Sequence, residues 1–186
     1  LDLVKRSGCH YLVYAPESGS QKTLDNVKKR ITIEKITESM LIAKDVGLTL
    51  RANLILGFPG EKRLDVLKTM IYGWKISLKG VDEVAYFLFS AYPGSEIFNN
   101  LLKESKVKLN DAYFLELTSL NGKFNTLRPK TYNEYMPSLE LALYRTIGMS
   151  VAYLIGYLRF PRRIFRTISN VFFKKNAAST VLEHRL

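Results

Sequence analysis

The stretch from Arg51 to Glu61 constrains the fold more than any other part of the sequence. It reads Arg-Ala-Asn-Leu-Ile-Leu-Gly-Phe-Pro-Gly-Glu, an apolar run that stops at a Gly-Phe-Pro-Gly turn before a charged segment with helical spacing. A continuous apolar strand that ends in such a turn is typical of a buried parallel strand leading into a crossover helix. In α/β folds the functional residues lie outside the carboxyl ends of the strands. The sequence therefore predicts a parallel sheet with a functional turn at residues 57–61.

Two further apolar runs have the same character. Residues 9–15 and 83–89 are rich in Tyr, Phe and Val and, like residues 49–56, are predicted to be strands. The strands start roughly 35 to 40 residues apart with helical sequence between them, which is the length of a βαβ unit. Successive units of this kind build a parallel sheet with right-handed crossovers. Each strand ends in a polar or Gly/Pro-rich turn, so we expect these turns to meet at one edge of the sheet; they are residues 16–20, 57–61 and 90–94.

Helices are predicted between and after the strands. Residues 1–7 form the end of a helix that stops at Gly8, and Thr32 caps a helix that ends before Gly47. Ser138 begins a long helix, and Pro161 kinks or restarts it. Shorter helices are expected at residues 20–30 and 95–103.

The helix after the Gly-Phe-Pro-Gly turn has the clearest periodicity. Its apolar residues alternate in steps of three and four, which predicts an inward-facing stripe made of Leu64, Leu67, Ile71, Trp74 and Leu78. The same pattern predicts that the charged residues face outward, namely Lys62, Arg63, Asp65, Lys68 and Lys75.

The net charge of +11 is distributed unevenly over the 186 residues. Residues 1–143 hold 20 Lys or Arg against 16 Asp or Glu, whereas residues 144–186 hold 8 against 1. The basic character is therefore mainly a property of the C-terminal part, and an anionic partner is expected there first.

Cysteine content and hydropathy limit the class of protein. Cys9 is the one cysteine, which rules out an intrachain disulfide and a metal site made of several cysteines of this chain, and it fits a cytoplasmic setting. There is no signal-peptide pattern and no run of 18 apolar residues, and the apolar segment at residues 147–158 is too short to span a bilayer. Because the chain starts inside a helix-like segment at Leu1, we interpret it as a fragment whose N-terminal part is missing.

The basic tail allows alternative interpretations. Residues 159–175 carry six Arg or Lys and no acidic residue, and apolar side chains such as Ile164, Phe165 and Ile168 lie between them. This pattern is typical of an amphipathic helix on an anionic membrane surface. The same charge can contact nucleic-acid phosphates, which is the less favoured partner. In the third interpretation the apolar side packs on the rest of the chain and the charges are solvated.

Four motifs occur in an order that resembles a known family. They are Gly8-Cys-His-Tyr-Leu-Val-Tyr-Ala-Pro-Glu-Ser-Gly-Ser20, Lys29, Leu54-Ile-Leu-Gly-Phe-Pro-Gly-Glu61 and Tyr92-Pro-Gly-Ser-Glu96. Together they are similar to the later half of a radical S-adenosylmethionine enzyme barrel, in the branch that usually carries a cobalamin-binding domain. The resemblance covers residues 1–103, and Tyr157-Leu-Arg-Phe-Pro161 resembles a C-terminal motif of the family.

The resemblance implies a fold and a division of the chain. The expected fold is α/β: a partial (β/α) TIM-like barrel made of the last three or so βα units, followed by an α-helical C-terminal extension. Residues 1–103 would be the C-terminal half of the barrel and residues 104–136 a variable segment on the substrate side. Residues 137–186 would be the basic amphipathic tail.

The resemblance also implies cofactor-binding residues near the first strand. Glu17 and Ser18 would offer acceptors and a hydroxyl group to the ribose or amino group of S-adenosylmethionine. Lys29 would pair with the carboxylate of the cofactor. Taken alone, Glu17 is equally a helix cap, and Lys29 a solvated surface charge.

At the second and third strands the resemblance implies contacts to the adenine and the substrate. Asn53, Ile55 and Gly57 match the motif that packs on the adenine and hydrogen-bonds it, with glycine allowing close backbone approach. Tyr92 and Pro93 would lie beside the substrate. Glu61 is expected only to favour a helix N-terminus.

What the resemblance implies for function depends on residues outside this chain. The family binds a 4Fe-4S cluster through a three-cysteine motif that is absent here, so the chain alone is expected to be inactive. The full protein would generate a 5′-deoxyadenosyl radical for hydrogen abstraction, with methyl transfer in the cobalamin-dependent members. A reducing partner such as flavodoxin or ferredoxin and a small-molecule or lipid-like substrate are expected.

The second functional hypothesis is a membrane-surface or nucleic-acid-binding module, with the protein at the inner face of the membrane. Ala15-Pro16 and Arg30 depart from the family pattern.

Overall fold

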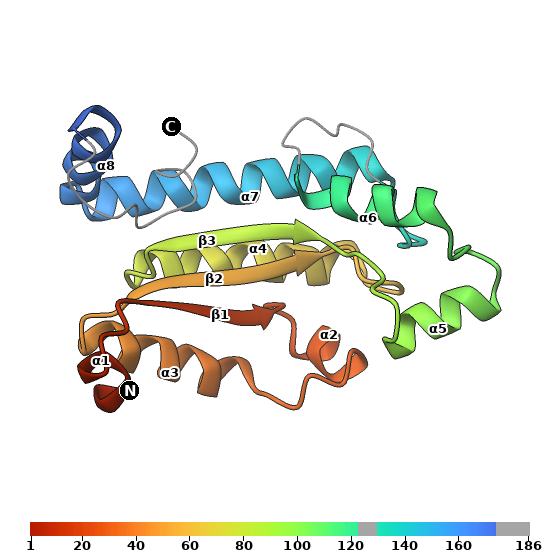
Figure 1. The fold of residues 1–186 in the computed structure, drawn as a ribbon, viewed down its shortest axis with the longest axis horizontal. Coiled ribbons are helices and arrows are strands. Elements are labelled where there is room, and N and C mark those ends of the chain that lie inside the picture. The colour runs from red at the N-terminus through yellow and green to blue at the C-terminus, as the bar shows by residue number, and fades with distance from the viewer. Residues whose placement is uncertain (123–129, 174–186) are drawn as a thin grey trace.

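The three predicted strands form one parallel sheet. The computed structural model describes residues 1–122 and 130–173. Strands β1 (Tyr11–Glu17), β2 (Thr49–Leu56) and β3 (Glu83–Leu88) lie in the order β1-β2-β3, and both neighbouring pairs are parallel (Figure 1). The predicted bounds of β2 are confirmed, while β1 lies two residues further along the chain than predicted. The order of the strands confirms successive βαβ units.

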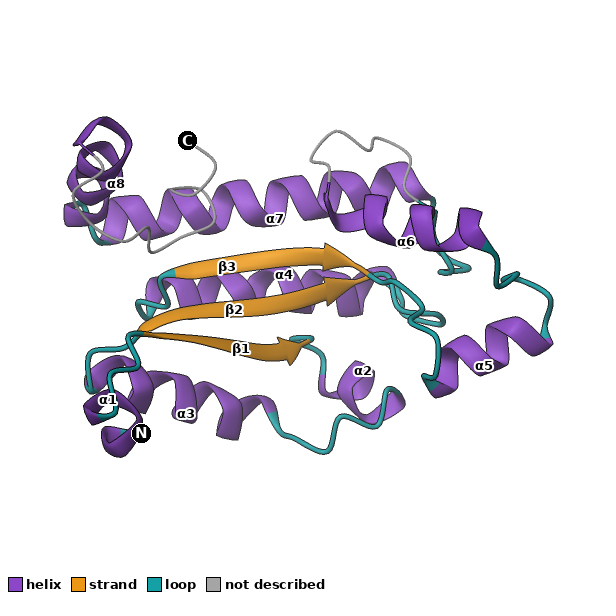
Figure 2. Cartoon of the chain, viewed as in Figure 1, coloured by secondary structure: helices purple, strands orange, loops and turns teal. Residues whose placement is uncertain are grey.

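Helices cover one face of this sheet. Helices α3, α4, α6 and α7 contact the strands, and Figure 2 shows α4 behind the sheet, α3 along β1 and α7 along β3. The mixed α/β class is therefore confirmed, and the described strands form an open sheet, so that the barrel stays a prediction. The helices are α1 (Asp2–Arg6), α2 (Gln21–Asn26), α3 (Ile33–Asp45), α4 (Arg63–Leu78), α5 (Glu96–Lys103), α6 (Asp111–Gly122), α7 (Ser138–Arg159) and α8 (Arg162–Phe173).

Alternation along β2 separates the two faces of the sheet. Leu50, Leu54 and Leu56 are fully buried in the main core between the sheet and the helices. The residues between them, including Asn53 and Ile55, are half-buried and point to the opposite face. That face of β2 is therefore the one that is free to contribute to a binding site.

The helix ends predicted from capping residues are mostly confirmed. Gly8 follows α1 with φ of 92°, and the Thr32 hydroxyl accepts a hydrogen bond of 3.3 Å from the backbone of Lys35. Ser138 is the first residue of α7. The helix predicted at residues 20–30 is shorter, because the backbone at Lys28 is left-handed with φ of 57° and cannot continue α2.

Most of the stripe predicted to face the core on α4 is exposed instead, and of its five residues only Trp74 is half-buried and packs against the core. Leu64 is 64% exposed and Ile71 is 43% exposed, whereas Asp65, which was predicted to face outward, is 6% exposed. The prediction was wrong for these residues because α4 is enclosed by the sheet, by α7 and by the turn after β1, which contact its smaller and polar residues. The other charged residues, Lys62, Arg63, Lys68 and Lys75, are exposed as predicted. The buried side is made of Asp65, Val66, Thr69, Met70, Tyr72, Gly73, Ile76 and Ser77.

Helix α7 overturns the expectation that no helix is long and apolar enough to cross a membrane. It has 22 residues, and by length and composition alone it meets that description. The apolar run counted in the sequence was shorter than the helix, which continues it on the N-terminal side to Ser138. In the structure α7 packs on β3 and α4, and the indole of Trp74 donates a 3.1 Å hydrogen bond to the carbonyl oxygen of Gly148.

Candidate functional site

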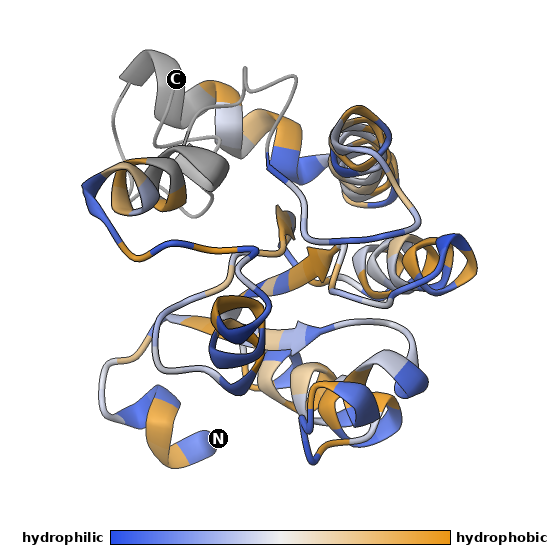
Figure 3. Cartoon of the chain, turned by 90° about the vertical axis from the view of Figure 1, so that its right-hand side faces the viewer, coloured by the Kyte–Doolittle hydropathy of each residue, from blue (hydrophilic) through white to orange (hydrophobic). Residues whose placement is uncertain are grey.

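The turns that follow the three strands gather at the carboxyl edge of the sheet, as predicted. Figure 3 looks at this edge directly, with helices seen end-on around the strands. The second and third turns touch through the rings of Phe58 and Phe89, whose centroids are 5.1 Å apart. Helix α2, which follows the first turn, is joined to the second turn by a 3.3 Å hydrogen bond from the Thr23 hydroxyl to the Glu61 carboxylate. The second turn is thus held against the third turn on one side and against the start of α2 on the other.

Glu17 and Lys29 form an ion pair at this edge. The Lys29 ammonium lies 3.0 Å from the Glu17 carboxylate, and both side chains are partly accessible. The backbone of Glu17 is left-handed, with φ of 68°, at the end of an irregular stretch of β1. A non-glycine residue seldom adopts this conformation, and such strain concentrates at functional sites. Glu17, predicted to contact the ribose or amino group of the cofactor, and Lys29, predicted to contact its carboxylate, are therefore neighbours.

Ser18 points the other way, towards α4. It is fully buried, and its hydroxyl lies 2.8 Å from the Thr69 hydroxyl and accepts a 3.0 Å bond from the backbone of Ser20. A Cβ at Gly19 would lie 2.4 Å from the Cβ of Tyr72, so the turn needs glycine to approach α4 this closely. The structure gives Ser18 the role of fixing the turn, with Glu17 on the accessible side.

Glu61 fixes the Gly-Phe-Pro-Gly turn from inside. Its carboxylate accepts hydrogen bonds from the backbone N–H groups of Gly57 at 2.7 Å and Phe58 at 3.2 Å, and the side chain is only 4% exposed. Burial raises the pKa of Glu61 to about 7, although these hydrogen bonds and the one from Thr23 act in the opposite direction. Glu61 therefore anchors the turn from a buried position. The sequence had led us to expect only that it favours the N-terminus of the following helix.

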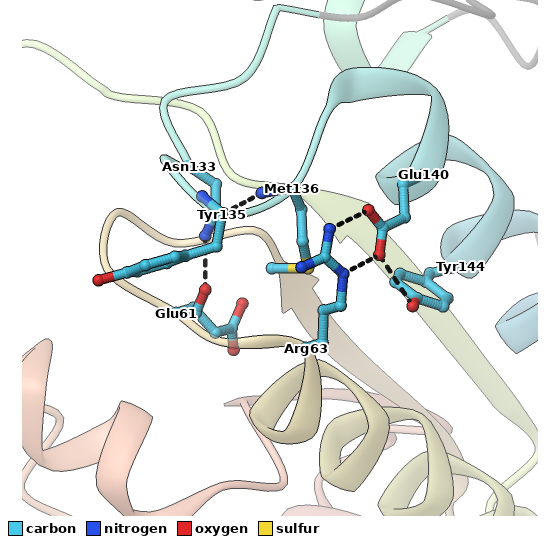
Figure 4. A network of polar contacts seen from close by, with 7 residues as sticks. All are labelled: Glu61, Arg63, Asn133, Tyr135, Met136, Glu140 and Tyr144. Carbon is cyan, nitrogen blue, oxygen red and sulfur yellow. Dashed lines mark hydrogen bonds and ion pairs between the residues drawn. The ribbon is translucent and has the colours of Figure 1, made fainter.

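The loop before α7 is hydrogen-bonded to the same turn. Asn133 is buried, and its side-chain amide donates a 2.8 Å hydrogen bond to the carbonyl oxygen of Glu61 (Figure 4). The same amide donates a 2.7 Å hydrogen bond to the carbonyl oxygen of Phe58. Its side-chain oxygen accepts 2.9 Å bonds from the backbone of Tyr135 and Met136. Asn133 thus ties the loop before α7 to the predicted functional turn.

The free face of β2 carries polar and apolar groups side by side. The oxygen of Asn53 accepts a 2.9 Å bond from Arg51, whose guanidinium lies 5.6 Å from the ring centroid of Phe87 on β3. Ile55 lies on the same face and packs against the aromatic cluster at the carboxyl edge, which contains Phe58, Phe89, Phe98, Tyr113 and Tyr132. Asn53 and Ile55 therefore share one face of β2, which pairs with the strand that ends in Glu17.

The fold requires glycine at position 57 for a reason that the sequence motif did not reveal. Its φ is 85°, and a Cβ there would lie 2.7 Å from the Leu141 side chain of α7. The glycine is therefore required by its backbone conformation and by the packing of α7. Close approach of an adenine on the other side stays a prediction.

Tyr92 and Pro93 lie in the turn after β3. Tyr92 is 60% exposed, and its carbonyl oxygen accepts hydrogen bonds from the backbone and hydroxyl of Ser95, which also caps α5. The turn is therefore held by its own hydrogen bonds, and the Tyr92 ring projects from it.

Sequence reasoning did not identify Glu61 as an anchor or Asn133 as part of the site. The spacing of Glu61 from Gly57 is a local signal that a carboxylate can reach back to the turn. No such signal exists for Asn133, because it is 75 residues from Phe58. Within residues 1–122 and 130–173, no group of three His, Cys, Asp or Glu side chains is placed to hold a metal ion.

The fold and the site define a class of protein: an α/β chain that presents charged and polar groups on loops at the carboxyl edge of a parallel sheet. Comparison with known proteins then gives the chemistry of its relatives. The chain is similar to an uncharacterized methyltransferase of Pyrococcus horikoshii, with 26% identity over 165 residues, covering 89% of this chain and 32% of the relative. It is also similar to a putative methylthiotransferase of Methanocaldococcus jannaschii, with 28% identity over 106 residues, covering 57% and 23%.

A third relative is the tRNA-2-methylthio-N(6)-dimethylallyladenosine synthase of Buchnera aphidicola, with 33% identity over 100 residues, covering 50% of this chain and 22% of the relative. No family model matches the chain. The chain spans about a third or less of the length of these relatives. All three relatives carry the names of enzymes, and these names indicate methyl-transfer or methylthio-transfer chemistry.

Proposed function

We propose that this chain is the C-terminal part of a radical S-adenosylmethionine enzyme and binds S-adenosylmethionine at the carboxyl edge of its sheet. The observation that carries the proposal is the Glu17–Lys29 pair, 3.0 Å apart beside the strand that bears Asn53 and Ile55. The methyltransferase and methylthiotransferase relatives support a reaction in which a methyl or methylthio group is transferred.

The donor and acceptor groups at this edge fit the cofactor. Its amino-acid end is a zwitterion, and Lys29 offers a positive charge to its carboxylate while Glu17 offers acceptors to its ammonium or to the ribose hydroxyls. Asn53 supplies an amide for the adenine edge, and Ile55 an apolar surface for the ring. Ser18, Glu61 and their partners enter the proposal only as groups that hold the turns in place.

The iron–sulfur cluster does not fit the residues of this chain. One cysteine is present, and cluster binding needs several thiolates. In the proposal the cluster ligands, and cobalamin where it is used, come from other parts of the full protein, together with a reducing partner. When bound, S-adenosylmethionine supplies the radical or methyl-transfer chemistry; this chain binds it, orients it and excludes water.

The substrate is proposed to approach from the side of Tyr92 and Pro93. The aromatic cluster beside them contains Tyr113 and Tyr132, so the segment at residues 104–136 contributes to that side of the site. This supports its proposed role as the substrate-side segment.

The coding sequence upstream of Leu1 tests the radical part of this proposal. We expect it to encode Cys-x3-Cys-x2-Cys in the same reading frame, since these thiolates are what the cluster requires. A reading frame without that motif would rule out the radical reaction. Binding of S-adenosylmethionine at the carboxyl edge of the sheet is tested separately by titration.

A further inference from the structure

Helix α8 is attached to the rest of the chain by its polar side. The guanidinium of Arg163 donates to the carbonyl oxygens of Gly80 at 2.9 Å and Val81 at 3.2 Å. It also lies 3.1 Å from the Asp82 carboxylate, with both side chains at most 15% exposed. The anchor of α8 is therefore a buried ion pair and two charge-assisted hydrogen bonds at the loop before β3.

The apolar side of α8 faces away from this anchor. Phe165 is 73% exposed, Ile168 is 48% exposed and Ile164 is 40% exposed. At the neighbouring end of α7, Leu158 is 74% exposed and Leu154 is 56% exposed. The interpretation in which the apolar side of the tail packs on the rest of the chain is therefore wrong for these residues. A helix that buries its polar side and presents its apolar side needs an apolar partner.

The charges around this surface indicate which partner. Between Glu140 and Glu183 the sequence contains no Asp or Glu, and it contains seven Arg or Lys. Arg159 and Arg162 flank the exposed apolar residues and are themselves exposed, and no ion pair involves either of them in the described part of the chain. Exposed apolar side chains flanked by exposed arginines are complementary to a bilayer with anionic headgroups.

We propose that α8 and the end of α7 bind the surface of an anionic phospholipid membrane, with Phe165, Ile168 and Leu158 in the acyl-chain boundary and Arg159 and Arg162 at the headgroups. The polar anchor through Arg163 holds α8 in the orientation that this requires. Figure 1 places α8 at the end of the molecule away from the carboxyl edge of the sheet. A membrane-bound chain therefore keeps the candidate site open, and the proposal does not depend on the cofactor.

Vesicle flotation of the purified chain tests this proposal. We expect it to float with vesicles of phosphatidylcholine and phosphatidylglycerol at low salt, and to dissociate near about 1 M salt, where the Debye length is about 3 Å. Phe165→Asp is expected to lower the partition coefficient at least about tenfold, since it removes the inserted ring and adds a charge that anionic lipid repels. Replacing Arg159 or Arg162 by alanine lowers it about fivefold for each charge.

A matched control separates lipid insertion from a general effect of surface charge. Leu115 on α6 is 72% exposed, close to the value for Phe165, and Leu115→Asp is expected to change binding by less than about twofold. Far-UV circular dichroism of each variant checks that the fold is kept.

Three results would overturn the proposal. The first is no flotation at either salt concentration, and the second is equal flotation with vesicles of phosphatidylcholine alone. The third is a concentration-dependent dimer in sedimentation velocity that Phe165→Asp abolishes without any lipid binding, which would assign the surface to a second copy of the chain.

Discussion

Replacement of Glu61 by alanine is expected to lower the free energy of unfolding by about 3 kcal/mol near neutral pH. The substitution removes the acceptor of the Gly57 and Phe58 N–H groups and leaves a cavity where a side chain is only 4% exposed. The hydrogen bond from Thr23, which joins α2 to the second turn, is lost as well. Urea unfolding followed by circular dichroism measures the change.

Glu104 provides the control for this substitution. Its ion pair with Lys106 is on the surface, with side chains 55% and 48% exposed, so Glu104→Ala is expected to cost less than about 0.5 kcal/mol. If Glu61→Ala has an effect no larger than Glu104→Ala, then Glu61 does not anchor the turn.

The pH dependence of stability provides a second test of Glu61. Burial raises its pKa from an ordinary value of 4.5 to about 7, so between these values the folded state binds more protons than the unfolded state. The stabilisation from this difference is fully present below the unfolded pKa and is lost as the pH rises through 7. The shift corresponds to about 3 kcal/mol at most.

Glu61→Gln removes this titration while keeping the size and an acceptor oxygen. We expect the wild-type chain to lose stability relative to the glutamine variant as the pH rises from 4.5 to 8. A difference between the two that stays constant across this range would show that the pKa of Glu61 is not raised.

Asn133→Ala is expected to lower the free energy of unfolding by about 2 to 4 kcal/mol, since each of its hydrogen bonds contributes about 0.5 to 1.5 kcal/mol. Its side chain donates to two carbonyl groups of the Gly-Phe-Pro-Gly-Glu turn and accepts from two backbone N–H groups of its own loop. The substitution removes these four hydrogen bonds, three of them buried, and it disconnects the loop from the turn. Urea unfolding measures the loss.

Two further variants show which bonds of Asn133 matter. Asn133→Asp keeps the acceptor for Tyr135 and Met136 but places a second oxygen against the carbonyl groups of Phe58 and Glu61, so we expect a loss at neutral pH at least as large as that of alanine. Asn100 on α5 is exposed, and Asn100→Ala is expected to change stability by less than about 0.5 kcal/mol. A tolerated Asn133→Asp would mean that the two carbonyl contacts contribute little.

Strands and turns of this chain could be predicted because their signals are local. The apolar run before Gly57 predicted the bounds of β2 correctly, and the turns after all three strands meet at one edge as the βαβ spacing requires. The Glu17–Lys29 contact spans only 12 residues, from the end of β1 to the segment that follows α2. Motif position was sufficient to propose both residues.

Packing between distant segments could not be predicted from periodicity. The spacing of Leu64, Leu67 and Ile71 was correctly recognised as helical, but it did not reveal that polar residues of the turn after β1 occupy the opposite side of α4. The direction of Ser18 and the reach of Asn133 depend on contacts 51 and 75 residues away in the chain. The side that a helix buries is decided by what surrounds it.

Titration of S-adenosylmethionine into the purified chain, followed by isothermal calorimetry, tests the central claim most directly. We predict saturable binding that Lys29→Met weakens by about 10- to 100-fold, because a charge-assisted hydrogen bond contributes about 1.5 to 3 kcal/mol. Lys22→Met removes the same charge from an exposed position on α2 and is predicted to change the dissociation constant by less than about twofold. A folded chain that shows no saturable binding, or an equal loss in both variants, would contradict the assignment of the carboxyl edge as the cofactor site.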